Sequence, residues 1–467
     1  MKSASVLEIC AATGGVLEEG SSTALFSGIS TDTRSIKQGD LFIPLVGKNY
    51  DGHDFAINAI EKGASGILFS HAGINIASLL VVKIKVNDTL KALGDIASFH
   101  RKRSRAKIVA ITGSVGKTST KDMTASVLAV GHRVIKSEAN FNNEIGLPLT
   151  LLKLDDDCDF AVVEMGMRAI GEISRLSFIA QPDICIITNI GVSHIERLGS
   201  RQNILKAKLE IIDGMNNDGI AILNGDDPLL LGVRGSIKQK TLYYGMGMNL
   251  DFIACDIMQK GIEGVTFSLL YNSKRSEFCI KQPGLHNVYN ALAAITAGIS
   301  AGMAPEEIAS GLRKCKPNPM RLNIVVRGSI KVIDDTYNAS PQSMVAALDV
   351  LSMIPGATRR IAILGDMLEM GDWAVEAHKE TGYFAASRNI DRILTIGELS
   401  KYIALAAVES GFDSGKIISA TDGKAAIPVI ADLVKPGDAI LVKGSRGMKM
   451  EEVVEFLFKL FPECDVQ

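Results

Sequence analysis

The chain has 467 residues, with 50 basic and 52 acidic side chains and a formal net charge of −2 at pH 7. At ~150 residues per domain, this length predicts about three domains. A hydrophobic fraction of 47% with 22% charged residues is enough for several buried cores, which excludes wholesale disorder. The near-neutral charge argues against a dedicated nucleic-acid binder, so no nucleic acid is expected as a partner.

Seven cysteines are scattered and never form a C-x-x-C pair, which argues against a disulfide scaffold and excludes a sequence-evident zinc site. Glu8 follows closely behind a short apolar run, so the N-terminus does not read as a signal peptide. No stretch approaches the ~18 consecutive apolar residues of a membrane span. We therefore expect a soluble, cytoplasmic protein. One basic cluster is interpreted as a solvated helix end rather than a binding patch: Arg101, Lys102, Arg103 and Arg105.

The first 104 residues mix short apolar runs with turn-rich segments and end in a helical pattern over 89–105. We place the first domain boundary at Ser104. From Lys107 onward, strands alternate with helices. The continuous apolar run 108–112 is typical of a buried parallel strand, and a glycine loop and a helix over 117–130 follow it.

Further buried strands are predicted at 160–164, 184–188 and 220–224, with a helix over 200–215. This βαβ alternation predicts a parallel sheet covered by helices. Residues 251–280 alternate without a helical period and predict an antiparallel annex, followed by a helix over 286–302.

Pro317 and Pro319 form a double break that indicates a linker. Beyond it the alternation restarts, with strands predicted at 331–335, 360–364, 392–396 and 439–442, and helices at 341–353, 373–386, 398–410 and 450–461. The fold class is therefore α/β in three domains: residues 1–104, a central parallel-sheet domain over 105–317, and a smaller Rossmann-like domain over 318–467.

The strongest local signal is a glycine loop between the strand at 108–112 and the next helix. It comprises Gly113, Ser114, Val115, Gly116, Lys117, Thr118 and Ser119. Backbone N–H groups of such a loop cradle phosphate oxygens, Lys117 reaches the β/γ-phosphates, and Thr118 is placed to bind Mg²⁺. The standard G-x-x-x-x-G-K-[ST] pattern would need glycine at Ile111, so this loop is shortened. The alternative is a glycine turn that merely caps a helix.

Two strand ends carry further polar candidates. Glu164 ends one buried strand, and we favour a metal role over a solvated strand-end acid, on position alone. His194 follows the next strand and reads as either a structural hydrogen-bonder or a metal or phosphate contact. Lys206 and Lys208 read, from the residues alone, as surface lysines of an amphipathic helix. A polar turn reads as a helix cap or a substrate-binding loop: Asn142, Asn143 and Glu144.

These motifs together resemble the ATP-dependent Mur ligase family. The resemblance rests on T-G-S-V-G-K-T-S, N-F-N-N-E-I-G-L-P, E-M-G, N-I-G-x-x-H-x-E, A-K-x-E-I, H-N-V-Y-N-A-L-A-A, P-M-R-L, D-D-T-Y-N-A-S-P and L-V-K-G-S-R-G-M-K-M, in family order from about Ser30 to Glu452. The shortened phosphate loop is the family's form. D-D-T-Y-N-A-S-P at 334–341 and L-G-D-M-L-E-M-G at 364–371 resemble the member that joins D-alanyl-D-alanine to UDP-N-acetylmuramoyl-tripeptide.

The resemblance implies a UDP-substrate domain, an ATPase domain and an amino-acceptor domain in that order, acting as a monomer with ATP and Mg²⁺. It implies that Lys117, Glu164, His194 and Lys208 are catalytic. Thr118, Glu164, His194 and Lys208 would hold metal, with Lys208 carbamylated. The phosphate loop would bind ATP together with Asn287, Asn290, Arg321 and Asp335.

The resemblance also implies two substrate sites. The UDP-sugar would be bound by Thr31, Asp32, Arg34, Gly47, Lys48, Asp51 and His53. The dipeptide would be lined by Asn338, Ser340, Lys443, Ser445 and Arg446. The expected reaction is acyl-phosphate formation on the tripeptide carboxylate, followed by attack of the D-Ala-D-Ala amine. The rival hypotheses are another ligase of the superfamily, such as one that adds a single amino acid, and a nucleotide-dependent switch that only hydrolyses ATP.

Overall fold

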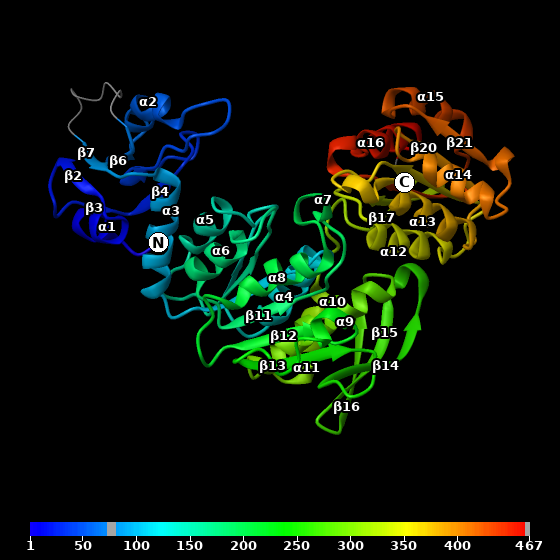
Figure 1. Cartoon of the computed structure of the whole chain (residues 1–467), viewed down its shortest axis with the longest axis horizontal. Helices are drawn as coiled ribbons and strands as arrows, with labels where there is room; N and C mark the ends of the chain where they lie inside the picture. Colours follow the sequence, from blue (N-terminus) through cyan, green and yellow to red (C-terminus); the bar gives the residue numbers. More distant parts are fainter. Residues whose placement is uncertain (72–80, 463–467) are drawn as a thin grey trace, which may run out of the picture.

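The computed structural model describes residues 1–71 and 81–462, whose strands form three main sheets placed one after another along the chain (Figure 1). The first sheet has the order β2-β7-β6-β5-β4, with β2 antiparallel and the others parallel. Its strands are β2 (Val16–Glu19), β4 (Gly28–Ser30), β5 (Asp40–Phe42), β6 (Gly66–Phe69) and β7 (Val82–Lys85); β1 (Ala4–Ser5) and β3 (Leu25–Phe26) pair separately. The helices here are α1 (Val6–Thr13), α2 (Ala56–Glu61) and α3 (Thr89–Lys102).

The central sheet has nine strands in the order β16-β15-β14-β13-β12-β11-β8-β10-β9. Parallel pairing runs from β9 to β14. The residues expected to form an antiparallel annex are antiparallel, but they extend this same sheet through β14. The strands are β8 (Lys107–Thr112), β9 (Val134–Lys136), β10 (Phe160–Glu164), β11 (Ile184–Ile187), β12 (Ile220–Asn224), β13 (Lys240–Gly245), β14 (Phe252–Gln259), β15 (Val265–Tyr271) and β16 (Lys274–Ile280).

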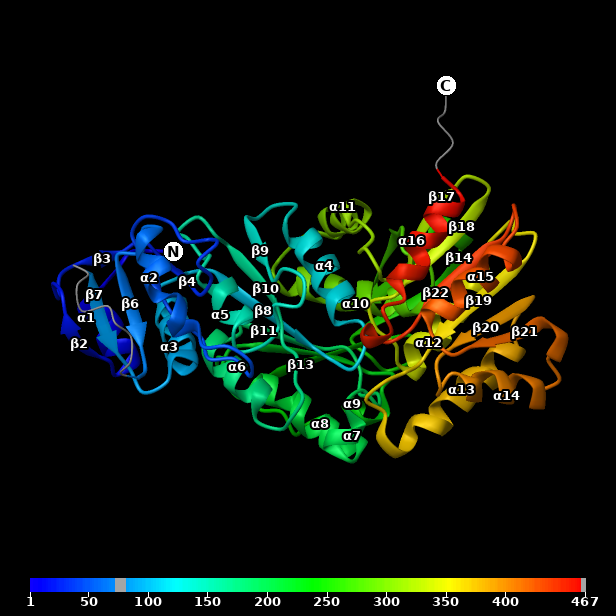
Figure 2. The same cartoon turned by 90° about the horizontal axis from the view of Figure 1, so that it is seen from above.

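Helices cover both faces of the central sheet. Figure 2 shows α4, α10 and α11 on one face and α6 and α8 on the other. The helices are α4 (Lys117–Leu128), α5 (Gly146–Leu151), α6 (Glu172–Ala180), α7 (Ile195–Leu198), α8 (Arg201–Leu209), α9 (Pro228–Leu231), α10 (Leu285–Ser300) and α11 (Pro305–Lys314). The helix predicted over 200–215 corresponds to α8, which is shorter because the 3-10 turn η2 (Glu210–Ile212) follows directly after Leu209.

The C-terminal sheet has the order β17-β18-β22-β19-β20-β21, with only β17 antiparallel. Its strands are β17 (Asn323–Arg327), β18 (Ile330–Asp335), β19 (Arg360–Gly365), β20 (Arg392–Ile396), β21 (Ile417–Ala420) and β22 (Ala439–Lys443); its helices are α12 (Pro341–Ser352), α13 (Ala374–Ala386), α14 (Lys401–Glu409), α15 (Gly423–Leu433) and α16 (Glu451–Leu460). Helix α15 was not predicted, because Pro428 lies inside it and proline ordinarily interrupts a helical pattern. Within residues 1–71 and 81–462, no sheet crosses Ser104 or Pro317, and the boundaries themselves stay predictions.

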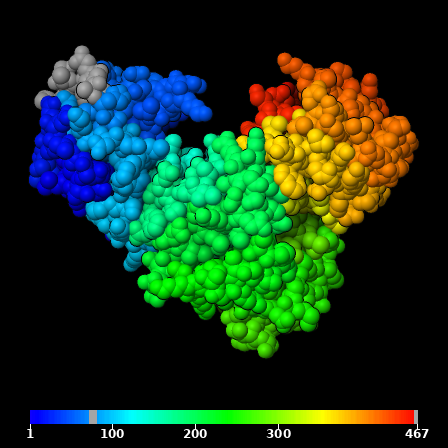
Figure 3. All heavy atoms as spheres, viewed as in Figure 1, coloured from blue at the N-terminus to red at the C-terminus, as the bar shows by residue number. Residues whose placement is uncertain are grey.

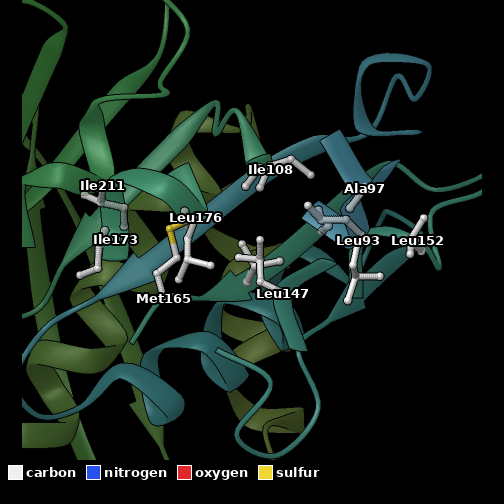
Figure 4. Close-up of a cluster of buried hydrophobic side chains, with 14 of the residues drawn as sticks. Leu93, Ala97, Ile108, Leu147, Leu152, Met165, Ile173, Leu176 and Ile211 are labelled. Atoms are coloured by element: carbon white, nitrogen blue, oxygen red, sulfur yellow. The ribbon is translucent and has the colours of Figure 1, made fainter. Parts of the chain in front are cut away.

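The three predicted α/β units are confirmed, and the first two share one hydrophobic core. In Figure 4, Leu93 and Ala97 of α3 lie beside Leu147, while Met165 and Leu176 continue the same cluster. By contrast, the buried residues of both clusters around the C-terminal sheet all come from residues after Ser329. The N-terminal unit is therefore packed onto the central one through apolar contacts that involve α3.

The interpretation of the basic cluster as solvated is wrong for Arg101, which is only 8% exposed. Its guanidinium donates to the carbonyls of Ala180 and Gln181 at 3.0 and 3.3 Å and to Asp183 Oδ2 at 3.0 Å. Leu93, Ala97 and Arg101 recur every four residues, so Arg101 lies on the buried stripe of α3. It joins α3 to the central unit through hydrogen bonds that a shorter side chain does not reach.

We expect Arg101→Gln to lower the free energy of unfolding by about 1–3 kcal/mol, because buried carbonyls and Asp183 would lose their charged donor. Urea unfolding followed by far-UV circular dichroism measures the shift. Arg105→Gln is the matched control, since this exposed side chain on the same cluster also loses one positive charge. Equal shifts for both variants would contradict the structural role of Arg101.

No helix in the described ranges is both long and apolar enough to cross a membrane. The described cysteines, from Cys10 to Cys315, are free, while Cys464 lies outside the described residues.

Candidate active site

The phosphate loop lies between β8 and α4, as predicted, and its two glycines are required by geometry. Gly113 has φ 151°, and a Cβ there would lie 1.8 Å from Thr188 Oγ1. Gly116 has φ 84°, and a Cβ there would lie 2.6 Å from Asn290 Oδ1. Because no side chain caps α4, the N–H groups of its first turn remain available to an anion. These features favour a phosphate cradle over a helix cap alone.

Lys117 begins α4 and lies folded against its own loop. Its Nζ donates to the carbonyls of Gly113 and Ser114 at 2.8 and 3.2 Å. Burial lowers the pKa of Lys117; the negative charge of Glu164 opposes this shift and the positive charge of Arg321 adds to it. The pKa of the Lys117 amine therefore depends on Glu164 of the central unit and on Arg321 of the C-terminal unit.

Strands β10 and β11 flank β8, which brings Glu164 next to the loop. Glu164 is only 3% exposed, so the solvated-acid alternative does not hold. One carboxylate oxygen accepts from Thr118 Oγ1 at 2.8 Å and the other from Asn142 Nδ2 at 3.0 Å. The carboxylate of Glu164 therefore lies against the loop hydroxyl of Thr118.

Lys208 corrects the interpretation based on the residues alone: it is 2% exposed, whereas Lys206 is on the surface. The signal was available, because Ile204, Lys208 and Ile211 recur at helical spacing on one buried stripe. Burial lowers the pKa of Lys208 well below its usual value, Lys117 lowers it further, and Glu164 opposes the shift. Its amine has no hydrogen-bond or ion-pair partner within the described part of the chain. A buried, readily deprotonated amine therefore lies beside the phosphate loop.

His194 follows β11 and precedes α7, with its backbone in the left-handed region at φ 63°. Its Nδ1 lies 3.1 Å from Glu369 Oε2, a residue of the C-terminal unit. Burial and the positive charges of Lys117 and Lys208 lower the pKa of His194, and Glu369 opposes them. Its predicted location at the strand edge is confirmed, whereas its partner was not foreseen.

The two amides expected at the adenine lie on α10 and bond to one another. Asn290 Nδ2 donates to Asn287 Oδ1 at 3.0 Å, and Asn287 Nδ2 donates to the Pro283 carbonyl at 2.8 Å. Asn290 Oδ1 accepts from Thr120 Oγ1 on α4. The pair thus fixes α10 against the helix that begins at the phosphate loop.

In the polar turn, Asn143 Oδ1 accepts from the N–H groups of Ile145 and Gly146, as a helix cap does. Asn142 instead reaches Glu164, and Glu144 pairs with Arg175. The helix-cap interpretation therefore holds for Asn143, and the substrate-binding interpretation stays a prediction.

The C-terminal candidates include a buried ion pair between Asp335 and Lys443. The resemblance had assigned Asp335 to the ATP site and Lys443 to the dipeptide site. Lys443 Nζ donates to Asp335 Oδ2 at 2.6 Å and to the Asn338 carbonyl at 2.9 Å. Arg321 lies over the ring of Tyr337 at 3.9 Å. Ser340 begins α12 and Ser445 accepts from the N–H of Leu368. Arg446 forms a salt bridge with Glu451.

A cavity of about 1010 Å³ joins the central and C-terminal candidates. It is lined by phosphate-loop residues, Glu164, His194, Lys208, both α10 amides and the C-terminal group from Arg321 to Arg446. Leu90 is the only described residue before Lys107 that lines it. In Figure 3 a wide hollow separates the N-terminal and C-terminal units above the central one.

The UDP-sugar candidates therefore lie outside this cavity. Asp32 accepts hydrogen bonds from the Arg34 side chain at 2.6–3.0 Å, and those bonds lower the pKa of Asp32 to about 2. Thr31, Gly47 and Lys48 likewise do not line the cavity.

Asp51, His53 and His71 have the composition of a metal site, and their ligand atoms lie within 4.8 Å of one another. The hydrogen bonds argue against it. The N–H of Ser70 donates to His53 Nε2, so His53 carries its proton on Nδ1, which faces Asp51 Oδ1 at 2.6 Å. Asp51 also accepts from His71 Nε2 at 2.9 Å. These hydrogen bonds already satisfy His53, and they fix the 51–53 segment against the end of β6.

Several cavity residues were not singled out as site residues from the sequence. The Asn189 side chain both donates to and accepts from the backbone of Val115, clamping the loop. His286, beside Asp335 and Lys443, has its pKa lowered to about 4 by burial. Asn189 lies two residues after β11 and Glu369 four residues after β19, so their positions close to strand ends could have indicated them.

Comparison with known proteins gives three family matches in chain order: the Mur ligase family catalytic domain at residues 25–101, the Mur ligase middle domain at 111–298, and the Mur ligase glutamate ligase domain at 320–446. The chain is 42% identical to UDP-N-acetylmuramoyl-tripeptide--D-alanyl-D-alanine ligase of Bacillus subtilis (strain 168), over 92% of this chain and 93% of that one.

Solved structures agree with these matches. A crystal structure of MurF from Acinetobacter baumannii has a TM-score of 0.89 at 30% identity, covering 98% of this chain and 99% of that one. MurF ligase from Thermotoga maritima, in complex with ADP, has a TM-score of 0.81 at 27% identity and covers 93% and 97% of the two chains. The chain is an ATP-dependent ligase. It belongs to the Mur ligase family.

The electrostatics around Glu164 generate a prediction that needs no substrate. We expect Glu164→Gln to lower the pKa of both Lys117 and Lys208 further, because the carboxylate is the charge that favours their protonated forms. Competitive acetylation across a pH series in CO₂-free buffer, read by mass spectrometry, measures both values. Glu172→Gln, at another cavity carboxylate, should leave them unchanged; unaltered profiles in Glu164→Gln would contradict the prediction.

Proposed function

We propose that this chain joins D-alanyl-D-alanine to UDP-N-acetylmuramoyl-tripeptide with ATP, releasing ADP and phosphate, in cytoplasmic synthesis of peptidoglycan precursors. The observation that carries the proposal is the cavity that unites the phosphate loop with side chains of the 334–341 segment. Residues 1–104 would bind the UDP-substrate, 105–317 ATP, and 318–467 the dipeptide. The enzyme is proposed to act as a monomer, as the resemblance to the family implies.

The chemistry requires an activated carboxylate, because a carboxylate oxygen is a poor leaving group. The tripeptide carboxylate attacks the γ-phosphate of ATP, giving an acyl phosphate and ADP. The dipeptide amine then attacks the acyl carbon, and phosphate leaves. Two anions approach in the first step, so placed positive charge stabilises the transition state. The phosphate loop and α4 hold the ATP phosphates, and Lys117 exchanges its loop carbonyls for phosphate oxygens.

The residues around Glu164 fit Mg²⁺. A nearly buried carboxylate and the Thr118 hydroxyl lie 2.8 Å apart, and hard oxygen donors are those Mg²⁺ prefers. His194 and Lys208, if carbamylated, complete the proposed set. When bound, Mg²⁺ supplies charge neutralisation between the two anions. Asn142 orients the Glu164 carboxylate by donating to it.

The remaining roles follow from charge and hydrogen-bonding capacity. Asn287 and Asn290 bind the adenine edge, which both donates and accepts. Arg321 and Asp335 approach the nucleotide from the C-terminal unit. The dipeptide is lined by Asn338, Ser340, Lys443, Ser445 and Arg446, and the amide turn with Asn143 and Glu144 faces the peptide substrate. The uridine diphosphate end is bound by Thr31, Asp32, Arg34, Gly47, Lys48, Asp51 and His53.

The proposal predicts that ADP release requires both substrates together. We expect strong stimulation by UDP-N-acetylmuramoyl-tripeptide with D-Ala-D-Ala, and little with single amino acids, in a coupled spectrophotometric assay. Equal stimulation by single amino acids would favour a different amide ligase. ADP release that ignores both substrates would indicate a simple ATPase switch.

The same reaction tests the acyl-phosphate route. If the tripeptide carboxylate carries heavy oxygen, one labelled atom should appear in the released phosphate, detected by mass spectrometry. Phosphate without the label would rule out this route while leaving the substrate assignment intact.

Lys208 has the properties needed for carbamylation. CO₂ reacts with a neutral amine, and burial with Lys117 nearby favours the neutral form of Lys208. Carbamate formation releases one proton and replaces the neutral amine with an anion beside Glu164. This change would convert an unpaired buried amine into an oxygen ligand.

We expect intact-protein mass spectrometry to show one added CO₂, and activity to fall in CO₂-free buffer and return with bicarbonate. Lys208→Arg, which stays charged, should lose activity by about 10–100-fold and respond to neither condition. Lys206→Arg on the same helix is the control and should behave like the unmodified chain. A fully active Lys208→Arg would contradict the role.

A further inference from the structure

One contact at the cavity crosses from the central unit to the C-terminal unit. Glu369 lies in the loop between β19 and the 3-10 turn η4 (Gly371–Trp373), and its Oε2 is 3.1 Å from His194 Nδ1. Both side chains line the cavity. The contact therefore joins the loop after β11 of the central sheet to the loop after β19 of the C-terminal sheet.

The backbone at both ends of this contact is in an unusual conformation. His194 has φ 63° and Glu369 has φ 60°, a left-handed region that costs about 1–3 kcal/mol for residues other than glycine. The two backbone segments also approach closely, since a Cβ on Gly371 would lie 3.1 Å from Glu196 Cβ. Such conformations persist where packing holds them, and they cluster at functional sites. Two of them facing each other indicate a contact that the fold maintains.

The contact between His194 and Glu369 determines which ring nitrogen of His194 carries the hydrogen. An ionised carboxylate only accepts hydrogen bonds, so His194 Nδ1 carries the hydrogen that meets Glu369. A histidine binds a metal ion through a ring nitrogen that carries a lone pair, so a ligating imidazole is neutral. In a neutral imidazole with its hydrogen on Nδ1, Nε2 carries the lone pair. No described side chain or backbone group donates to this Nε2 in the structure.

We propose that Glu369 is a positioning residue that holds His194 in the Nδ1–H tautomer, so that Nε2 offers its lone pair to a divalent cation in the cavity. A carboxylate behind a metal-ligating histidine is a recurrent arrangement that fixes ring orientation and raises basicity. Here the carboxylate comes from the C-terminal unit, so docking of that unit completes the ligand. The cation rests on the proposed function, but the tautomer does not.

The tautomer is tested on the enzyme without substrates, by nitrogen NMR of the chain labelled at its histidines. His194→Gln identifies the His194 signals by their loss. We expect the Nδ1–H tautomer in the unmodified chain, a shift toward Nε2–H or a mixture in Glu369→Ala, and retention in Glu369→Gln, whose amide oxygen still accepts. Asp372→Asn, an exposed acid in η4, is the charge-matched control and should change nothing. An unchanged tautomer in Glu369→Ala would overturn the proposal.

The consequence for the cation is read separately, with Mn²⁺ as the probe in the presence of ADP. We expect Glu369→Ala to weaken Mn²⁺ binding by about 10–100-fold by titration calorimetry, and Glu369→Gln to weaken it less. Mn²⁺ binding that is equal in Glu369→Ala and Asp372→Asn would overturn the positioning role. If the ligase assay fails while the tautomer shifts as expected, the proposed function falls and this inference stands.

Discussion

The carboxylate of Glu164 is the charge on which the rest of the site depends. It is nearly buried, it holds the phosphate-loop hydroxyl of Thr118, and it orients Asn142 from a separate turn. It is also the negative charge that opposes the fall in pKa of both Lys117 and Lys208. Buried like charges repel strongly where the effective dielectric is low. One carboxylate therefore favours the protonated forms of two buried amines and holds the hydroxyl of the phosphate loop.

This arrangement follows from strand order. Strand β8 lies between β10 and β11, so the residues at the carboxyl ends of all three meet at one sheet edge. That edge is where open parallel sheets bind ligands. The phosphate loop, Glu164 and His194 could be located from the sequence because each lies at the end of a continuous apolar run or in the loop after it. Local pattern was sufficient wherever the site is built from adjacent parallel strands.

The failures of prediction also have a common cause. Arg101 and Lys208 were interpreted as solvent-exposed because they are charged, yet each lies on the buried stripe of its helix. In both cases the helical spacing, rather than the charge of the side chain, predicts the burial. Arg101 is buried against hydrogen-bond acceptors of the central unit, and Lys208 is buried at the cavity. Glu369 and the Asp335–Lys443 pair could not be inferred from spacing, since they depend on how distant segments meet. Helix α15 was missed for a local reason, the proline within it.

The two junctions between units differ in how far they share a hydrophobic core. The N-terminal unit shares an apolar core with the central one and is fastened by Arg101, so separating them would expose buried hydrophobic surface. The C-terminal unit has hydrophobic cores of its own, with Val192 and Ile262 of the central unit packed against one of them. It also meets the central unit through polar contacts, such as His194 with Glu369 and Asn318 with Asp122. Polar contacts exchange with water or ligand at little net change in free energy. The phosphate loop and Glu164 therefore belong to the body that α3 and the central sheet form together, whereas Arg321, Asp335 and Lys443 reach the cavity from a unit with cores of its own.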